Sequence, residues 1–169
     1  MQKEVPYGEA IVLKYPEQIV IAIARGPAGK YNPITLGWTM LASHKPPMMA
    51  IGVGLTRYSL ECIRHAGEFV IAMPSEHQAA EAMLFGTKSG RDTDKIAEAG
   101  AATLPAKAID CVLLADAVAN FECRLAGELE TGDHVVFAGE IVCSHVNERA
   151  LNRLYTVAPG HRLAGRPRG

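Results

Sequence analysis

Two strand-like runs in the first third of the chain contain residues that a simple core strand would not use. The runs cover residues 34–43 and 48–55, and the pair Pro46-Pro47 separates them. Large β-branched residues normally fill such strands, whereas here hydroxyl groups and glycines interrupt them: Thr35, Thr39, Ser43, Gly37 and Gly52. Either the glycines mark bulges and the hydroxyls face solvent, or a flat or polar ligand approaches the backbone closely. The composition of the two runs leaves both interpretations open.

The bulk properties restrict the class of protein. A chain of 169 residues with 49% hydrophobic and 21% charged residues fits one globular domain, over residues 1–169. A net charge of −1 gives no general attraction for nucleic acid or for an anionic membrane, so we expect neither as a partner. No apolar stretch reaches the ~18 residues of a membrane helix. The first residues lack the apolar segment of a signal peptide, which predicts a cytoplasmic location.

The cysteines and histidines do not form a recognisable metal or redox motif. No two of the four cysteines, Cys62, Cys111, Cys123 and Cys143, are within four residues of each other. Reduced, buried and unreactive thiols are therefore expected. The six histidines lack the His-x-x-x-His spacing, so no metal site is predicted. The basic residues near the end, Arg162, Arg166 and Arg168, are expected to belong to a frayed terminus.

The pattern of the elements indicates a mainly β protein with short helices. Strands are predicted at 19–24 and 69–73, and a hairpin turns at 131–133 with Phe121, Cys123 and Leu125 on its buried face. Short helices are predicted from Ser59, as N-cap, to Ala66, with Gly67 as the stop, from a Ser75/Gln78 capping box to Gly86, and over 93–99. Many strands with few helices favour a closed or nearly closed barrel over a doubly wound sheet.

Two segments have the composition of an anion site at the start of a helix. Arg57-Tyr58-Ser59 offers a guanidinium, a hydroxyl and free helical N–H groups. Ser89, Gly90, Arg91 and Lys95 repeat that combination in a loop before the third helix. The alternatives are a simple N-cap at Ser59 and a polar loop with local ion pairs.

No set of catalytic side chains can be identified. His134 lies beside Asp133 in the hairpin turn, where it could act as a base or orient the loop. Glu122 and Glu140 lie on adjacent predicted strands, but nothing marks them as an acid/base pair. Neither a Gly-x-Gly-x-x-Gly turn nor a Gly-x-Ser-x-Gly motif occurs.

The order of these motifs resembles the flavin reductase-like, FMN-binding split-barrel family, and within it the flavoredoxin-type branch. The matching stretches are Asn-Pro-Ile-Thr-Leu-Gly-Trp at 32–38, Arg-Tyr-Ser at 57–59, Gly-Thr-Lys-Ser-Gly-Arg at 86–91, Phe-Glu-Cys at 121–123 and Gly-Asp-His at 132–134. The resemblance implies a six-stranded split barrel that binds FMN non-covalently near the interface of a homodimer. It places the ring and ribityl chain against residues 32–43 and the phosphate at Arg57 and Ser59.

The residues that this resemblance and the local patterns assign to FMN are Asn32, Thr35, Leu36, Gly37, Trp38, Thr39, Ser43, Gly52, Arg57, Tyr58, Ser59, Ser89, Gly90, Arg91 and Lys95. The chain departs from the family pattern in two places. Ser59 stands where threonine is usual, which keeps the hydroxyl. The tail Pro159-Gly160-His161-Arg162 replaces an aromatic ending, so no contact between the tail and the flavin is expected.

The resemblance implies an NAD(P)H-dependent flavin reductase or another FMN-bound oxidoreductase, in which the flavin performs the hydride chemistry. A second interpretation is a flavoredoxin-like electron carrier that docks a protein partner and has little NAD(P)H activity. A third is a structural relative that binds no flavin.

Overall fold

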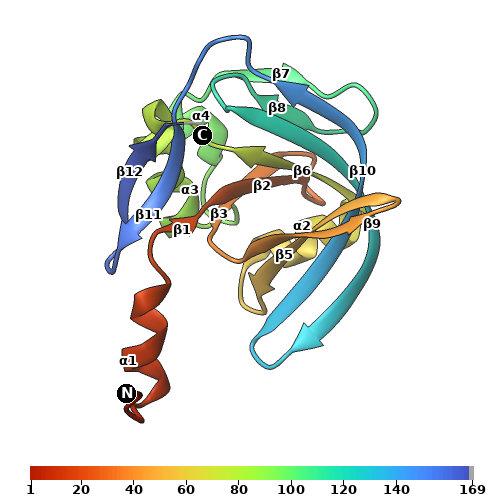
Figure 1. The fold of residues 1–169 in the computed structure, drawn as a ribbon. Helices are drawn as coiled ribbons and strands as arrows, with labels where there is room; N and C mark the ends of the chain where they lie inside the picture. The colour runs from red at the N-terminus through yellow and green to blue at the C-terminus, as the bar shows by residue number, and fades with distance from the viewer. Residues whose placement is uncertain (168–169) are drawn as a thin grey trace.

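A computed structural model describes residues 1–167 of the chain. Most elements are strands, with short helices between them (Figure 1). The elements, in chain order, are α1 (Tyr7–Ile11), η1 (Val12–Lys14), β1 (Glu17–Gln18), β2 (Val20–Arg25), β3 (Tyr31–Leu36), β4 (Thr39–His44), β5 (Pro47–Gly54), α2 (Tyr58–Ala66), β6 (Glu68–Met73), η2 (Glu76–Gln78), α3 (Ala79–Thr87), α4 (Lys95–Ala99), β7 (Thr103–Pro105), β8 (Val112–Leu114), β9 (Ala119–Thr131), β10 (His134–Val146), β11 (Arg153–Ala158) and β12 (Arg162–Arg166).

The main sheet has seven antiparallel strands in the order β3-β2-β6-β9-β10-β5-β4. The run predicted as one strand over 34–43 is two strands, because the chain bends at Gly37 and Trp38. The resulting β3 and β4 lie at opposite edges of this sheet. Two residues span only about 10 Å, so the sheet has to curl until its edges meet at this corner. The barrel prediction is confirmed, although the main sheet has seven strands instead of six.

Strand β2 is buried on both faces, which explains its continuous apolar sequence. Val20, Ala22 and Ala24 face the barrel interior with Phe69, Phe137 and the other residues of one core cluster. Ile21 and Ile23 face a second cluster, in which Phe85 of α3 and Leu114 of β8 cover the outside of the sheet. The strand predicted at 19–24 is therefore confirmed in type and nearly in extent.

The ends of the helices correct two predictions from the sequence. Arg57 is the N-cap residue of α2, and Ser59 lies inside the first turn with its side chain buried, so Ser59 is not a cap. Helix α4 begins at Lys95, where the Asp94 side chain accepts a hydrogen bond from the Ala97 N–H at 3.2 Å. The predicted stop at Gly67 is confirmed, because Gly67 adopts a left-handed φ of 66°.

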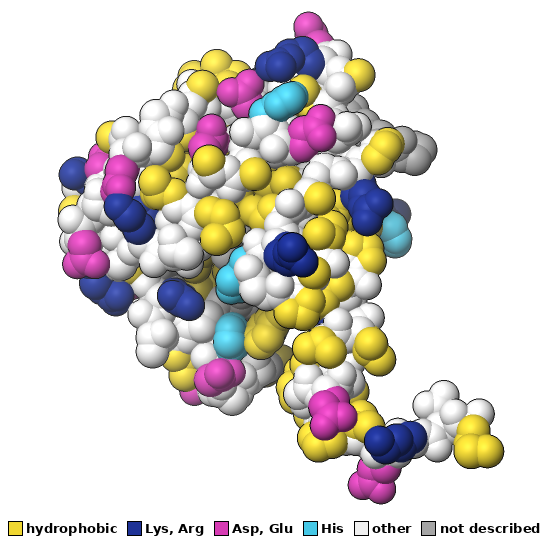
Figure 2. Space-filling view, turned by 90° about the vertical axis from the view of Figure 1, so that its left-hand side faces the viewer, with side chains coloured by type: hydrophobic (Ala, Val, Ile, Leu, Met, Phe, Trp, Pro, Cys, Tyr) yellow, Lys and Arg dark blue, Asp and Glu magenta, His cyan; other side chains and the backbone are white. Residues whose placement is uncertain are grey.

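The two ends of the described chain differ in how they pack against the body of the protein. Helix α1 projects from the body and has no buried residue (Figures 1 and 2). Beside it, Leu13 of η1 is 83% exposed. The other end forms β12, which pairs with β11, so the expectation that Arg162 and Arg166 lie in a frayed terminus is wrong. Arg168 lies outside the described residues.

Among residues 1–167, no helix combines the length and the apolar character that crossing a bilayer requires. The single domain over 1–169 and the cytoplasmic location stay predictions.

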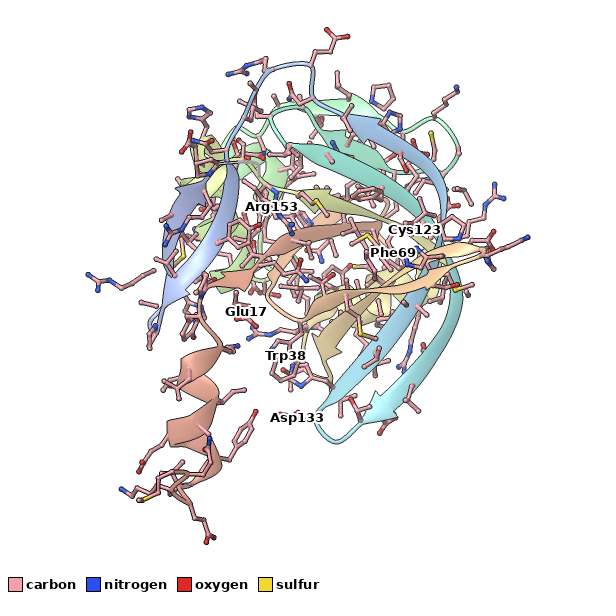
Figure 3. The ribbon with its side chains drawn as sticks, in the orientation of Figure 1. Glu17, Trp38, Phe69, Cys123, Asp133 and Arg153 are labelled. Atoms are coloured by element: carbon pink, nitrogen blue, oxygen red, sulfur yellow. The ribbon has the colours of Figure 1, made fainter. Side chains whose placement is uncertain are left out.

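The long hairpin of β9 and β10 contains two register shifts, one between Ala138 and Gly139 and one between Ile141 and Cys143. At the first shift, Gly139 packs against the barrel core. A Cβ atom added there would lie 2.6 Å from Phe69 Cζ and 2.8 Å from Cys123 Cβ, two side chains that lie together in Figure 3. Gly139 is therefore required by the close approach of the core.

We predict that Gly139→Ala destabilises the fold by about 1–3 kcal/mol, because the new methyl group overlaps fully buried atoms. Urea unfolding measures the change. Gly127→Ala is the matched control, since Gly127 lies across the same hairpin and a Cβ atom there would meet nothing within 4 Å. Equal stability of the two variants would contradict the prediction.

Candidate functional site

Three adjoining cavities form one groove at the corner between β3 and β4. Their volumes are about 270, 240 and 110 Å³. Arg57 and Gly86 line all three, so the cavities are continuous with one another. The side chain of Arg57 therefore lies at their junction, with its stem beside Gly54.

The smallest cavity opens at the first turn of α2. Thr56, Arg57, Tyr58 and Ser59 line it. The first N–H groups of a helix have no acceptor within the helix, and they carry partial positive charge. On the opposite wall, Asn32 Nδ2 donates to Ser59 Oγ at 2.7 Å, which leaves the Ser59 hydroxyl proton free to donate into the cavity. This arrangement suits an anionic group about the size of a phosphate.

Lys95 brings a buried cation to the same cavity. Its side chain is 3% exposed, and its Nζ donates to the carbonyl of Phe85 at 3.1 Å. An ammonium group has three N–H donors, so two remain for a ligand. Burial and, to a smaller extent, the nearby charge of Arg57 lower the pKa of Lys95 to about 8. An anion in the cavity would offset both effects.

The two arginines predicted for the phosphate occupy different places. No other described side chain forms a hydrogen bond or ion pair with Arg57, so its guanidinium is free for a ligand. Arg91 instead stacks on the outer face of Tyr58, 5.0 Å from the ring centroid, and pairs with Glu61 at 3.6 Å. Arg91 lines a neighbouring depression with Lys30 and Asp94 and none of the three cavities of the groove, although its guanidinium donates to the Thr56 carbonyl at 3.5 Å.

A tilted pair of rings forms one wall of the wider groove. Trp38 lies 4.2 Å from the His134 ring, centroid to centroid, and is 50% exposed. Its position between Glu17 and Asp133 is visible in Figure 3. His134 Nδ1 is 2.7 Å from Asp133 Oδ1, and this bond lowers the pKa of Asp133. His134 therefore makes a contact with Asp133 that orients the turn, which was one of the two roles expected from the sequence. It also lies on the groove wall.

Gly52 is explained by the packing of Trp38. A Cβ atom at Gly52 would lie 3.3 Å from Trp38 Cβ, and the Gly52 N–H donates to the Trp38 carbonyl at 2.8 Å. The glycine thus permits a close approach, as one interpretation of the sequence required, but the approaching group is a side chain of the protein. The hydroxyl of Thr35 does not face solvent either, because it donates to the Ala82 carbonyl of α3 at 2.6 Å.

The groove contains twelve of the fifteen residues predicted from the sequence: Asn32, Thr35, Leu36, Gly37, Trp38, Gly52, Arg57, Tyr58, Ser59, Ser89, Gly90 and Lys95. Thr39 lies on an adjoining apolar shelf beyond Trp38. Ser43 lies near the far end of β4, where its Oγ accepts a hydrogen bond from the Lys45 N–H at 3.2 Å. It lines none of the three cavities, and neither does Arg91.

Sequence reasoning missed several groove residues. Gly86 and Thr87 end α3 at the junction of the cavities. Both belong to the matching stretch 86–91, and Gly86 was the expected end of a helix, but neither was assigned to the site. His161 and Leu163 reach the groove from the turn between β11 and β12 and from β12. The tail was expected to stay away from any flavin, yet it contributes His161 to two of the cavities. No local signal in the sequence places the tail there.

One buried polar atom in the smallest cavity lacks a partner among the described residues. Asn32 is 4% exposed, and its Oδ1 accepts no hydrogen bond. Such an atom is costly unless a donor reaches it. A Cβ atom at Gly90 would lie within van der Waals overlap of Asn32 Oδ1, so the absence of a side chain at Gly90 keeps this cavity open. Cations, free N–H groups and an unsatisfied acceptor together fit the phosphate and hydroxyl groups of FMN.

The chain matches known proteins over most of its length. The model of the family described as "Flavin reductase like domain" matches residues 12–162. The chain therefore belongs to the flavin reductase-like family, and the family predicted from the order of the motifs is confirmed.

Individual relatives agree with this assignment. An uncharacterized protein of Archaeoglobus fulgidus is 33% identical over 113 residues, which is 67% of this chain but only 64% of that protein. A NADH-dependent FMN reductase of Streptomyces nodosus subsp. asukaensis is 29% identical over 131 residues, 78% of this chain and 70% of that protein. The crystal structure of flavoredoxin from Methanosarcina acetivorans superposes with a TM-score of 0.87 at 22% identity, over 100% of this chain and 93% of that chain. That structure shows the shared fold.

We predict that the wild type gains stability relative to Lys95→Met as the pH rises from about 8 to about 10. Burial holds the folded-state pKa near 8, whereas an unfolded lysine titrates near about 10.4. Between these values the unfolded chain binds more protons, so the free energy of unfolding rises with pH. Urea unfolding of the flavin-free protein at several pH values measures the difference.

The exposed Lys107→Met is the control for this series, and its stability should follow that of the wild type at every pH. A constant difference between the wild type and Lys95→Met from pH 7 to pH 10 would contradict the prediction.

Proposed function

We propose that the chain binds FMN in this groove and is an NAD(P)H-dependent flavin reductase. The observation that carries the proposal is the junction of a small cationic cavity with a wider groove walled by Trp38 and His134. FMN has the same two parts, a terminal phosphate and a flat ring, joined by a hydroxylated chain. The name of the Streptomyces nodosus relative supports FMN as the flavin and NADH as a reductant.

In this proposal the protein binds and orients the cofactor. Arg57 and Lys95 neutralise the phosphate, and the N–H groups of Tyr58 and Ser59 donate to it. Asn32 Oδ1 accepts a hydrogen bond from the ribityl chain. Trp38 and Leu36 exclude water from one side of the ring. The bound FMN supplies the hydride and electron chemistry, so no side chain needs to act as an acid or base.

An electron carrier of the flavoredoxin type is the second candidate. Apolar side chains are exposed beside the groove, namely Trp38 and Met40, and Leu41 follows them on β4. A protein partner could dock on such a surface and exchange electrons with the flavin. The two candidates share the FMN site and differ in the source of the electrons.

We propose also that the protein is a homodimer. The exposed apolar residues of the N-terminal segment, Tyr7, Ile11, Val12 and Leu13, contact no core of their own chain, and they suit an interface with a second copy. Light scattering of the FMN-loaded protein should give twice the chain mass. A monomeric mass at full FMN occupancy would contradict the proposal.

We predict that Arg57→Ala weakens FMN binding by about 1.5–3 kcal/mol, the range for a hydrogen bond to a charged group. Riboflavin, which has no phosphate, should bind the wild type more weakly than FMN and should lose little from the substitution. Flavin fluorescence quenching measures both affinities. The control is Arg91→Ala, because Arg91 is a nearby exposed arginine that lines none of the three cavities. Equal affinity of the wild type for FMN and riboflavin would rule out the phosphate assignment.

Anaerobic stopped-flow with NADH and with NADPH tests the activity. The FMN-loaded protein should lose its oxidised-flavin absorbance far faster than free FMN at the same concentration. With free FMN added in excess, the protein should catalyse many turnovers. If dithionite reduces the bound flavin and neither nicotinamide does so, the electron carrier is the correct function.

A further inference from the structure

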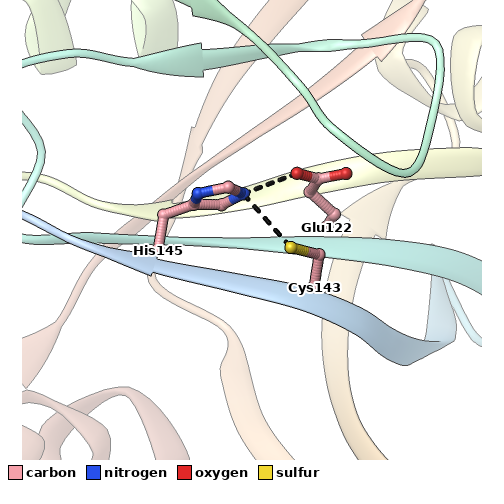
Figure 4. Close-up of side chains that lie close together, drawn as sticks. All are labelled: Glu122, Cys143 and His145. Carbon is pink, nitrogen blue, oxygen red and sulfur yellow. Dashed lines mark hydrogen bonds and ion pairs between the residues drawn. The ribbon is translucent and has the colours of Figure 1, made fainter.

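Outside the groove, one group of three metal-ligating side chains lies together within residues 1–167. It consists of Glu122 on β9 and of Cys143 and His145 on β10 (Figure 4). His145 Nε2 is 2.6 Å from Glu122 Oε1 and 3.5 Å from Cys143 Sγ. One carboxylate oxygen, the thiol sulfur and the ring nitrogen all lie within 4.8 Å of one another.

A β-bulge creates this group. Ile141 pairs with Cys123, but the register shifts after it, so that Cys143 pairs with Glu122. Val142 is left unpaired at this shift. In a ladder without the shift, Val142 would pair with Glu122, and Cys143 would pair with Phe121 and share its face. Two residues further along β10, His145 returns to the face of Cys143 and reaches Glu122 diagonally. The sequence predicted Cys143 on the buried face because this shift cannot be read from residue alternation.

The three donor atoms converge on one point, unlike the atoms of a nucleophile activated by a histidine. A Cys–His–carboxylate relay uses both ring nitrogens, one toward the thiol and the other toward the carboxylate. Here the same Nε2 faces both groups. A nitrogen carries either one proton or one lone pair, so it cannot serve both partners as a relay. A cation at the centre would satisfy all three groups together.

The carboxylate is fixed in place before any ion binds. Glu122 is 0% exposed, and its two oxygens accept the N–H groups of Lys107 at 2.9 Å and Ala108 at 2.6 Å. Backbone contacts of this kind orient a metal ligand. Cys143 and His145 are only partly buried, so an ion can enter from solvent.

We propose that Glu122, Cys143 and His145 bind one Zn²⁺ ion. Thiolate, imidazole and carboxylate are the ligand types of zinc, and three protein ligands leave the fourth tetrahedral position to water. Ligand atoms about 2.0–2.3 Å from a tetrahedral zinc ion lie roughly 3.3–3.8 Å apart, which the distance from sulfur to nitrogen already satisfies. The contact between nitrogen and oxygen has to lengthen by about 1 Å. On binding, Zn²⁺ replaces the thiol proton of Cys143, which leaves to solvent.

This site is separate from the flavin groove. His134 at the start of β10 lies on the groove wall, and His145 is eleven residues further along the same strand. At roughly 3.3 Å per residue, these positions are about 36 Å apart along the strand. Zinc binding should therefore occur equally with and without FMN.

The test uses the full chain, with and without bound FMN, after treatment with a chelator and dialysis. Calorimetric titration with ZnCl₂ should show one site per chain. In Cys143→Ala and in His145→Ala the affinity should fall by about 100-fold or more, since each variant lacks a direct ligand. Two variants serve as matched controls and should bind Zn²⁺ as the wild type does. Ser144→Ala changes the residue between the two β10 ligands, and His65→Ala removes an exposed histidine on α2. Free FMN at the same concentration corrects for binding by the phosphate.

Titration with CoCl₂ gives an independent readout. A thiolate ligand should add a sulfur-to-metal charge-transfer band, and tetrahedral Co²⁺ should add d–d bands at longer wavelength than oxidised flavin absorbs. Cys143→Ala should remove the charge-transfer band. Absence of a saturable site, equal affinity in Cys143→Ala and the wild type, or an octahedral Co²⁺ spectrum would each show that the three residues form a hydrogen-bonded group only.

Discussion

The bend at Gly37 and Trp38 is the constraint on which the rest of the structure depends. It joins strands at opposite edges of one sheet with only two residues between them, so the sheet must curl into a barrel. The bond from the Gly52 N–H to the Trp38 carbonyl fixes the bend onto β5. The same bend places the Trp38 ring on the wall of the groove, which means that barrel closure and the site have one cause.

The groove concentrates positive charge that the protein alone does not neutralise. Arg57 is free of ion pairs with other described side chains, and the pKa of Lys95 is lowered by burial and by the charge of Arg57. Holding two cations and the first turn of α2 around one small cavity costs stability when the cavity holds only water. An anionic ligand reverses that cost, and this is why we place the phosphate of FMN there. In the proposed function, the groove draws its affinity for the phosphate from an arrangement that is unfavourable without one.

Strand β10 joins the groove to the proposed zinc site because it is long and contains a β-bulge. Its first residue, His134, contacts Trp38, and near its other end Cys143 and His145 face Glu122. The remaining cysteines behave as the sequence predicted: burial raises the pKa of Cys111 and of Cys123 to about 12, which keeps these thiols protonated. Only Cys143 differs, and a single inserted residue in the ladder makes the difference.

The sequence by itself determined the family, the mainly β architecture, the helix stop at Gly67 and twelve of the residues that line the groove, because local composition and the order of the motifs carry that information. The tertiary structure alone decided where the run over 34–43 bends, that Ser59 contacts Asn32 instead of capping a helix, and that Arg91 turns toward Glu61. It also decided that His161 reaches the groove and that Cys143 meets Glu122. These features depend on strand register and on contacts between residues far apart in the chain. Alternation and spacing describe one segment at a time and cannot specify either.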